Sequence, residues 1–183
     1  FWLYWLFVLF AVGIEWSLIF WSADFLERIV GFTKADATSA VTAFLGAMTI
    51  GRFVGSRLAA NTDSLRLLII SVTLALFGFS IFWLAPIPSL NLVGLFIAGL
   101  GAANLYPLGL SIVTGLAPAL SDRASARIVL AASGAIFLAP QLLGSLADQV
   151  GIQSALGVTG LLGLSALAVL LVAQFGFGEN GKE

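Results

Sequence analysis

The 183-residue chain is 60% hydrophobic and only 9% charged, with a mean hydropathy of +1.09 and a formal net charge of -1. A soluble domain is closer to half apolar and a quarter charged, so we expect a polytopic membrane protein with no general attraction for nucleic acid. The chain contains no Cys and no His, which excludes disulfides, thiolate sites and Ser-His-Asp hydrolysis. We therefore expect no enzymatic activity, no metal site and no cofactor.

Six apolar segments follow one another along the chain, each near or above the ~20 residues that a helix needs to cross the hydrocarbon core. Polar residues, Pro and Gly separate them, and only helices can serve as separate spans in a membrane. The predicted fold class is an all-α membrane protein, with residues 1–183 forming one bundle of six transmembrane helices. The segments cover residues 2–22, 38–58, 65–85, 90–117, 124–147 and 153–177.

Glu15 is the only acidic residue well inside a predicted span. At a rise of ~1.5 Å per residue it lies past the middle of the first segment. A carboxylate at this depth is costly unless it faces protein or water, so it is a candidate functional group. The alternative is that a polar partner or a shallow depth satisfies it structurally.

The second segment ends in Gly51-Arg52-Phe53-Val54-Gly55-Ser56-Arg57-Leu58-Ala59, followed by a short polar turn. The G-x-x-x-G spacing of Gly51 and Gly55 allows another helix backbone to approach closely. Arg52 and Arg57 indicate the positively charged side of the membrane. This stretch is typical of a helix that leaves the membrane at its cytoplasmic surface.

The fourth segment contains a polar interruption that includes Asn104, Tyr106 and Pro107. Pro107 has no N–H and therefore frees a backbone carbonyl about one turn earlier. Interrupted helices near the bilayer midplane often build transporter sites, so Asn104 and Tyr106 are candidate cavity residues. Alternatively, Asn104 joins two helices. In the fifth segment, Gln141 follows Pro140 and is a further cavity candidate.

The third and sixth segments carry almost no polar residues, and we expect them to face lipid. Three glycines in the sixth segment, Gly157, Gly160 and Gly163, are more consistent with helix packing than with ligand binding.

An internal repeat relates the two halves of the chain. Gly55-Ser56 recurs as Gly144-Ser145, at an offset of 89 residues, and a charged turn and an apolar segment follow in both places. The offset also aligns Glu15 with Asn104. Residues 1–85 and 90–177 are then two units of three spans each. Because three is odd, we predict that the second unit is inverted in the membrane relative to the first.

The basic residues predict the orientation of the chain. With six alternating spans, Arg28 and Lys34 lie on one side of the membrane and the other six on the opposite side, which is then cytoplasmic. We expect both chain ends to be cytoplasmic and the protein to lie in a bacterial inner (plasma) membrane. The six are Arg52, Arg57, Arg66, Arg123, Arg127 and Lys182.

A family resemblance emerges from residues 144–151, which read Gly-Ser-Leu-Ala-Asp-Gln-Val-Gly. With Gly144, Asp148 and Gly151 they match the G-x-L-A-D-x-x-G signature of the major facilitator superfamily. The chain resembles the C-terminal half, helices seven to twelve, of such a transporter. Gly51 to Ala59 looks like the degenerate cytoplasmic copy of the signature. Ala59 replaces the signature Asp in this cytoplasmic copy. After the signature at residues 144–151, Ile152 and Gln153 replace the usual basic residues.

The resemblance implies half of a secondary transporter that moves a small solute by alternating access, and we expect coupling to protons through Glu15. In the family, helices seven and ten line the central cavity, which would place Glu15, Asn104 and Tyr106 there. The expected partners are the lipid bilayer and either a missing N-terminal six-helix half or a second copy of this unit. Because the chain begins with Phe, we expect a piece of a longer protein. A non-transporting membrane scaffold or sensor with the same fold is the alternative.

Overall fold

The computed structural model describes residues 1–116 and 118–178, and these are almost entirely helical. α1 (Trp2–Phe25) continues into a π-helical turn, η1 (Leu26–Val30), and α2 (Lys34–Ala59) and α3 (Ser64–Leu84) follow. The fourth segment forms α4 (Pro88–Ala102) and α5 (Leu105–Leu116). A 3-10 turn, η2 (Pro118–Leu120), leads to α6 (Ser121–Val150) and α7 (Ile152–Gly178).

The prediction of six membrane spans is confirmed for the described residues. Six helical stretches are long and apolar enough to cross a bilayer, and their ends differ from the predicted limits by a few residues in most cases. The largest differences lie in the first, fourth and fifth segments. The first extends through η1 to Val30, the fourth is two helices separated at residues 103–104, and the helical stretch of the fifth runs from Pro118 to Val150.

Local chemistry sets the helix ends. Thr33 and Asp63 cap α2 and α3, because their side-chain oxygens accept hydrogen bonds from the backbone N–H groups of Asp36 and Arg66 at 3.2 and 2.9 Å. Gly31 ends the first span, and Gly151 separates α6 from α7, with φ values of 89° and 83° that favour glycine. Tight turns therefore connect antiparallel helices.

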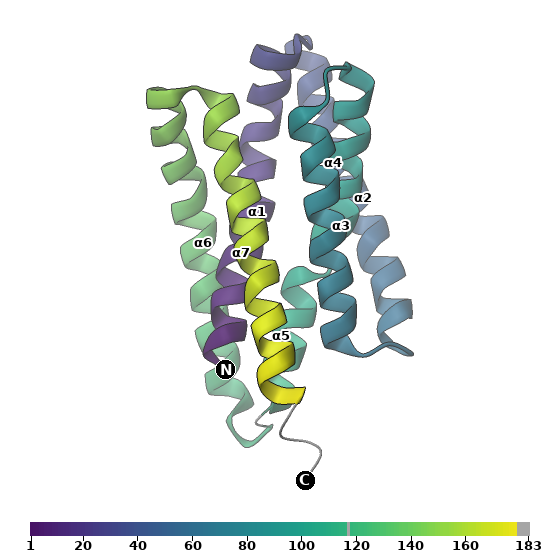
Figure 1. Cartoon of the computed structure of the whole chain (residues 1–183), viewed down its shortest axis with the longest axis vertical. Helices are drawn as coiled ribbons and strands as arrows, with labels where there is room; N and C mark the ends of the chain where they lie inside the picture. Colours follow the sequence, from purple (N-terminus) through teal and green to yellow (C-terminus); the bar gives the residue numbers. More distant parts are fainter. Residues whose placement is uncertain (117, 179–183) are drawn as a thin grey trace.

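The helices pack as a bundle in which α1 contacts α6 and α7, while α4 contacts α2 and α3. The beginning of α1 and the end of α7 lie at the same end of the bundle (Figure 1). Two core clusters are stacked along it. On α1 the first cluster ends at Val12 and the second begins at Ile14, and on the fourth span they meet at Ala102 and Ala103. Glu15 and the helix break lie near this junction.

Glycine residues allow the backbones of α3 and α4 to pack directly against each other. A Cβ atom added at Gly94 of α4 would lie 2.8 Å from the carbonyl oxygen of Gly78 on α3 and would contact the backbone nitrogen of Phe82. The predicted packing role of Gly157, Gly160 and Gly163 agrees with this geometry, because each of the three lies against a large side chain of α3.

Hydrogen bonds from indole N–H groups connect further helix pairs. Trp5 and Trp21 of α1 donate hydrogen bonds to backbone carbonyls of α6, and Trp83 of α3 donates to the carbonyl of Gln153 on α7. The donor–acceptor distances are 3.0, 3.0 and 2.8 Å. Tryptophans at the helix ends therefore serve helix packing in addition to any role in a membrane interface.

Gly94→Ala should destabilise the protein, by about 1–3 kcal/mol, because the added methyl group overlaps backbone atoms that cannot move independently. Gly115→Ala is the matched control in the same span, since nothing lies within 4 Å of a Cβ atom there. The measurement is thermal unfolding of the purified protein in detergent. Equal unfolding temperatures for the two variants would contradict the packing described for α3 and α4.

Candidate functional site

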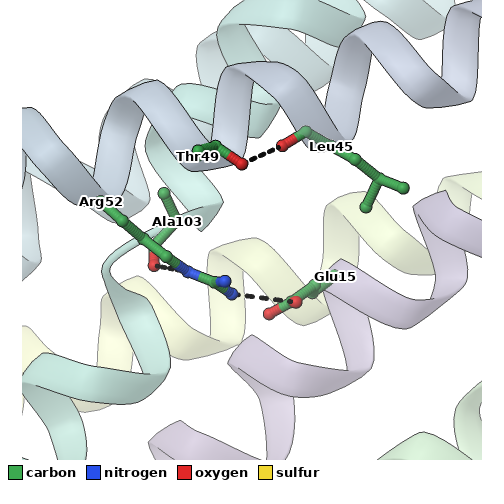
Figure 2. A network of polar contacts seen from close by, with 5 residues as sticks. All are labelled: Glu15, Leu45, Thr49, Arg52 and Ala103. Carbon is green, nitrogen blue, oxygen red and sulfur yellow. Dashed lines mark hydrogen bonds and ion pairs between the residues drawn. The ribbon is translucent and has the colours of Figure 1, made fainter.

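An acidic and a basic side chain face each other between α1 and α2. The Nη2 atom of Arg52 lies 3.8 Å from the Oε1 atom of Glu15, as Figure 2 shows. Glu15 is about 20 Å along α1 from its first residue, and Arg52 is about two turns before the end of α2. The Glu15 side chain is 15% exposed and that of Arg52 57% exposed. Both charges therefore lie within predicted membrane spans.

The break in the fourth span holds the guanidinium in place. Pro107 cannot donate the helical hydrogen bond that the carbonyl of Ala103 would otherwise accept. The Nε–H of Arg52 donates to this carbonyl instead, at 3.3 Å (Figure 2). The freed carbonyl expected from the sequence thus has a partner on another helix, and its position directs the end of the Arg52 side chain toward Glu15.

Asn104 joins α2 to the same break. Its Nδ2 group donates to the carbonyl oxygen of Gly51 at 2.9 Å, and the residue is buried. Gly51 and Gly55 make this contact possible, because a Cβ atom at Gly51 would lie 2.7 Å from the Leu100 carbonyl and one at Gly55 would overlap the Asn104 side chain. Asn104 therefore links the fourth span to α2 in this structure.

An open pocket of about 500 Å³ lies beside these contacts, between α2 and α5. Arg52, Ser56, Asn104 and Tyr106 contribute its polar lining. Gln141 lies outside this pocket, exposed on α6. The structure therefore brings three of the four predicted cavity residues together around Arg52, with Glu15 as its ionic partner, and leaves Gln141 apart.

The residues of the expected cytoplasmic loop motif lie at the end of a helix. Gly51, Arg52, Gly55 and Arg57 all lie within α2, and the turn itself begins at Ala60. The two glycines are packing positions, and Arg52 extends to Glu15 rather than toward the turn. Among these four residues, only Arg57 behaves as a residue of the helix end. Its exposed guanidinium lies 4.8 Å from the centre of the Phe53 ring.

The second motif lies at the opposite end of the bundle. Gly144 and Asp148 belong to α6, and Gly151 forms the turn to α7. Gly144 accommodates the indole of Trp21, which would lie 2.6 Å from a Cβ atom at that position. Asp148 is exposed. Gly144 and Gly151 thus have structural roles in packing and in the turn.

The sequence alone does not indicate the contacts that Arg52 makes with Ala103 and Glu15. The sequence places Arg52 among the basic residues expected at the cytoplasmic surface. The other basic residues described at that end of the bundle are Arg57, Arg66, Arg123 and Arg127. Lys182 lies outside the described residues. A buried acid and a carbonyl freed by proline both require a hydrogen-bond donor, so the sequence does indicate that a donor lies between them. The sequence alone did not identify which helix supplies it.

The fold and the site define a polytopic membrane protein with an ion pair and a broken helix in its spanning region. The family model of the Major Facilitator Superfamily matches residues 5–178. The chain belongs to this superfamily of membrane transporters.

Two curated relatives have transporter names. The chain is 28% identical over 157 residues to an uncharacterized transporter, y4wD, of Sinorhizobium fredii, and 26% identical over 154 residues to an uncharacterized MFS-type transporter of Yersinia pestis. These alignments cover 86% and 84% of the chain but only 41% and 40% of the relatives. The chain thus spans about two-fifths of the length of each.

Arg52→Ala should lower the stability of the protein by about 1–3 kcal/mol, because it leaves the Ala103 carbonyl without its donor and Glu15 without its counter-ion. Arg66→Ala is the matched control, since Arg66 is exposed at the beginning of α3. Thermal unfolding in detergent compares the two. The described role of Arg52 is wrong if Arg66→Ala is as harmful.

Proposed function

We propose that this chain is half of a secondary active transporter, which moves a small solute across the membrane by alternating access and couples transport to protons through Glu15. The observation that carries the proposal is the contact between Glu15 and Arg52 beside the broken fourth span. Ionisable residues inside spans are costly and usually mark ion or substrate pathways. Discontinuous helices are a recurrent feature of transporter binding sites.

The exposure of Arg52 supports a partner for this half. A guanidinium inside a span that is 57% exposed would be costly in contact with lipid, so protein or water must cover it. The matched relatives are long enough to hold a second six-helix half, because the chain aligns with only about two-fifths of each. We therefore favour a second half within the same polypeptide over a second copy of this unit.

The hydrogen bonds between helices support the inverted repeat. Asn104, on the fourth span, donates to the carbonyl of Gly51, and Trp21, on the first span, donates to the carbonyl of Pro140. Gly51 and Pro140 are 89 residues apart, the same offset that relates Gly55 to Gly144. In both places the donor side chain also lies against the glycine one turn later. We propose that residues 1–85 and 90–177 are the two repeat units.

The membrane orientation follows from the same scheme. Both chain ends are cytoplasmic, and the protein lies in the inner (plasma) membrane of a bacterium. The charge distribution supports this, because Arg57, Arg66, Arg123 and Arg127 share one end of the bundle, while Arg28 and Lys34 lie at the other. Both curated relatives come from bacteria.

A scaffold or sensor that keeps the fold but transports nothing would be expected to have a dry, apolar surface between the first and fourth spans. The ion pair of Glu15 with Arg52 and the polar lining of the adjacent pocket favour transport over this alternative.

Glu15→Gln in the complete protein should retain solute binding and counterflow but lose proton-driven accumulation, because the amide cannot take up and release a proton. Uptake into proteoliposomes with and without a pH gradient measures both activities. Glu27→Gln is the matched control, since Glu27 is exposed near the end of the same span. If Glu15→Gln accumulates solute as the unmodified protein does, the coupling site lies elsewhere.

Asn61→Cys and Ser89→Cys, in a background without other cysteines, should react from opposite sides of the membrane. Asn61 is exposed in the turn after α2, and Ser89 is exposed at the start of α4. A membrane-impermeant maleimide should label Ser89→Cys in intact cells and Asn61→Cys only after permeabilisation. The reverse labelling pattern would overturn the proposed orientation.

A further inference from the structure

The pocket beside the fourth span offers hydrogen-bond donors to a ligand. Arg52 supplies a guanidinium, and only its Nε–H is engaged at hydrogen-bond distance, with the carbonyl of Ala103. Tyr106, at the start of α5, also lines the pocket and carries a phenolic hydroxyl. Ser56 lies one turn after Arg52, and its hydroxyl donates to the Phe53 carbonyl of its own helix. Arg52 and Tyr106 are therefore the side chains best suited to donate to a bound molecule.

The contact between Arg52 and Glu15 is long, so another carboxylate could replace Glu15 at the guanidinium. The distance of 3.8 Å from Nη2 to Oε1 is longer than the 2.7–2.9 Å of a charge-assisted hydrogen bond. The Nε bond to Ala103 fixes the guanidinium, and one of its terminal nitrogens points toward Glu15 (Figure 2). Arg52 also belongs to the lining of the open pocket. The planar fork of a guanidinium can bind a carboxylate through two parallel N–H groups. A ligand carboxylate can therefore compete with Glu15 for the same group.

The charges around this position select for a ligand with one negative charge. Arg52 is the cation in the lining of the pocket, and the rest of that lining is uncharged. Arg57, the next basic residue on α2, lies at the end of the helix over the Phe53 ring. A single guanidinium balances a monocarboxylate, whereas a phosphate dianion requires further positive charge. Most of the remaining lining is apolar, including Ala59 and Leu108, which suits an organic body.

Glu15 faces no other ionisable group in the described part of the helices that pack against α1. α4 has none, and α5 has only Tyr106. The charged residues of α6 lie toward its two ends. The carbonyl of Arg127 accepts a hydrogen bond from Trp5, which is ten residues before Glu15 on α1, and Asp148 is in the last turn of α6. α7 has no charged residue between Ile152 and Phe175. On α2, Lys34 and Asp36 lie in the first turn and Arg57 in the last, which leaves Arg52 as the partner of Glu15.

We propose that the pocket binds a small organic monocarboxylate on the guanidinium of Arg52, with Tyr106 as a second donor, and that the ligand displaces Glu15, which takes up a proton as it is released. This inference rests on the proposed transport function and names the class of its solute. One proton from the aqueous side binds to a carboxyl oxygen of Glu15 for each anion that binds. The loaded site therefore has the same net charge as the empty one, and the proton and the anion leave together.

The test uses the complete protein in detergent and isothermal titration calorimetry with four organic probes: benzoate and lactate, and the neutral amides benzamide and lactamide. Inorganic phosphate is a fifth probe. Each titration is repeated in two buffers of different ionisation enthalpy, which gives the number of protons taken up on binding. The variants are Arg52→Gln and Glu15→Gln, and Arg66→Gln is the control because Arg66 is exposed at the beginning of α3.

At least one carboxylate should bind about 10-fold or more tightly than its amide, with uptake of about one proton, since hydrogen bonds to charged groups contribute strongly. Arg52→Gln should abolish this preference. Glu15→Gln should bind the same carboxylate at least as tightly with no proton uptake, because the competing group can no longer ionise. Arg66→Gln should match the unmodified protein.

Three results would each overturn the proposal. The first is no binding of either carboxylate in a titration that detects Kd values of about 1 mM. The others are equal binding of acid and amide, and unchanged proton uptake in Glu15→Gln. Preferential binding of phosphate would also contradict it. These outcomes are distinct from failure of the transport function. Proton-driven accumulation of a neutral solute would preserve the proposed function and exclude the carboxylate, whereas carboxylate binding without transport would do the reverse.

Discussion

The absent N–H of Pro107 is the constraint on which the site depends. It leaves the carbonyl of Ala103 without a helical donor, and a carbonyl in a membrane span must find another partner. The Nε–H of Arg52 supplies it, which fixes the guanidinium beside Glu15. A local defect in the fourth span thus determines where a positive charge from the second span lies, and how close it comes to the acid on the first.

Close packing brings the three helices near enough for this arrangement. Gly51 and Gly55 allow α2 to approach the break, and Asn104 adds a hydrogen bond to the Gly51 carbonyl. The same design recurs at the other end of the bundle, where Trp21 occupies the position beside Gly144 and donates to the Pro140 carbonyl. One end of the bundle uses a small amide and the other a large indole, so the proposed repeat preserves the acceptor and the glycine but not the donor.

Much of the fold could be predicted from the sequence, because apolar length and Pro-Gly punctuation define membrane helices strongly. The freed carbonyl before Pro107 and the polar character of Glu15 and Asn104 were also accessible from local chemistry. The role of Arg52 was not, because its position near the end of an apolar segment fits a surface charge equally well. Only the packing of α2 against the α4–α5 break decides between them. Gln141 failed to join the pocket for the same reason, since helix rotation is set by tertiary contacts.

The most direct test of this account is a double-mutant cycle of Glu15→Gln and Arg52→Gln, measured as the free energy of unfolding of the complete protein in detergent. Each single variant leaves one charge in the membrane without its counter-ion, and the double variant leaves neither. The account predicts that the double variant is more stable than the sum of the single effects implies, by well over 0.5 kcal/mol. Effects that add to within about 0.3–0.5 kcal/mol would show that the two side chains do not interact.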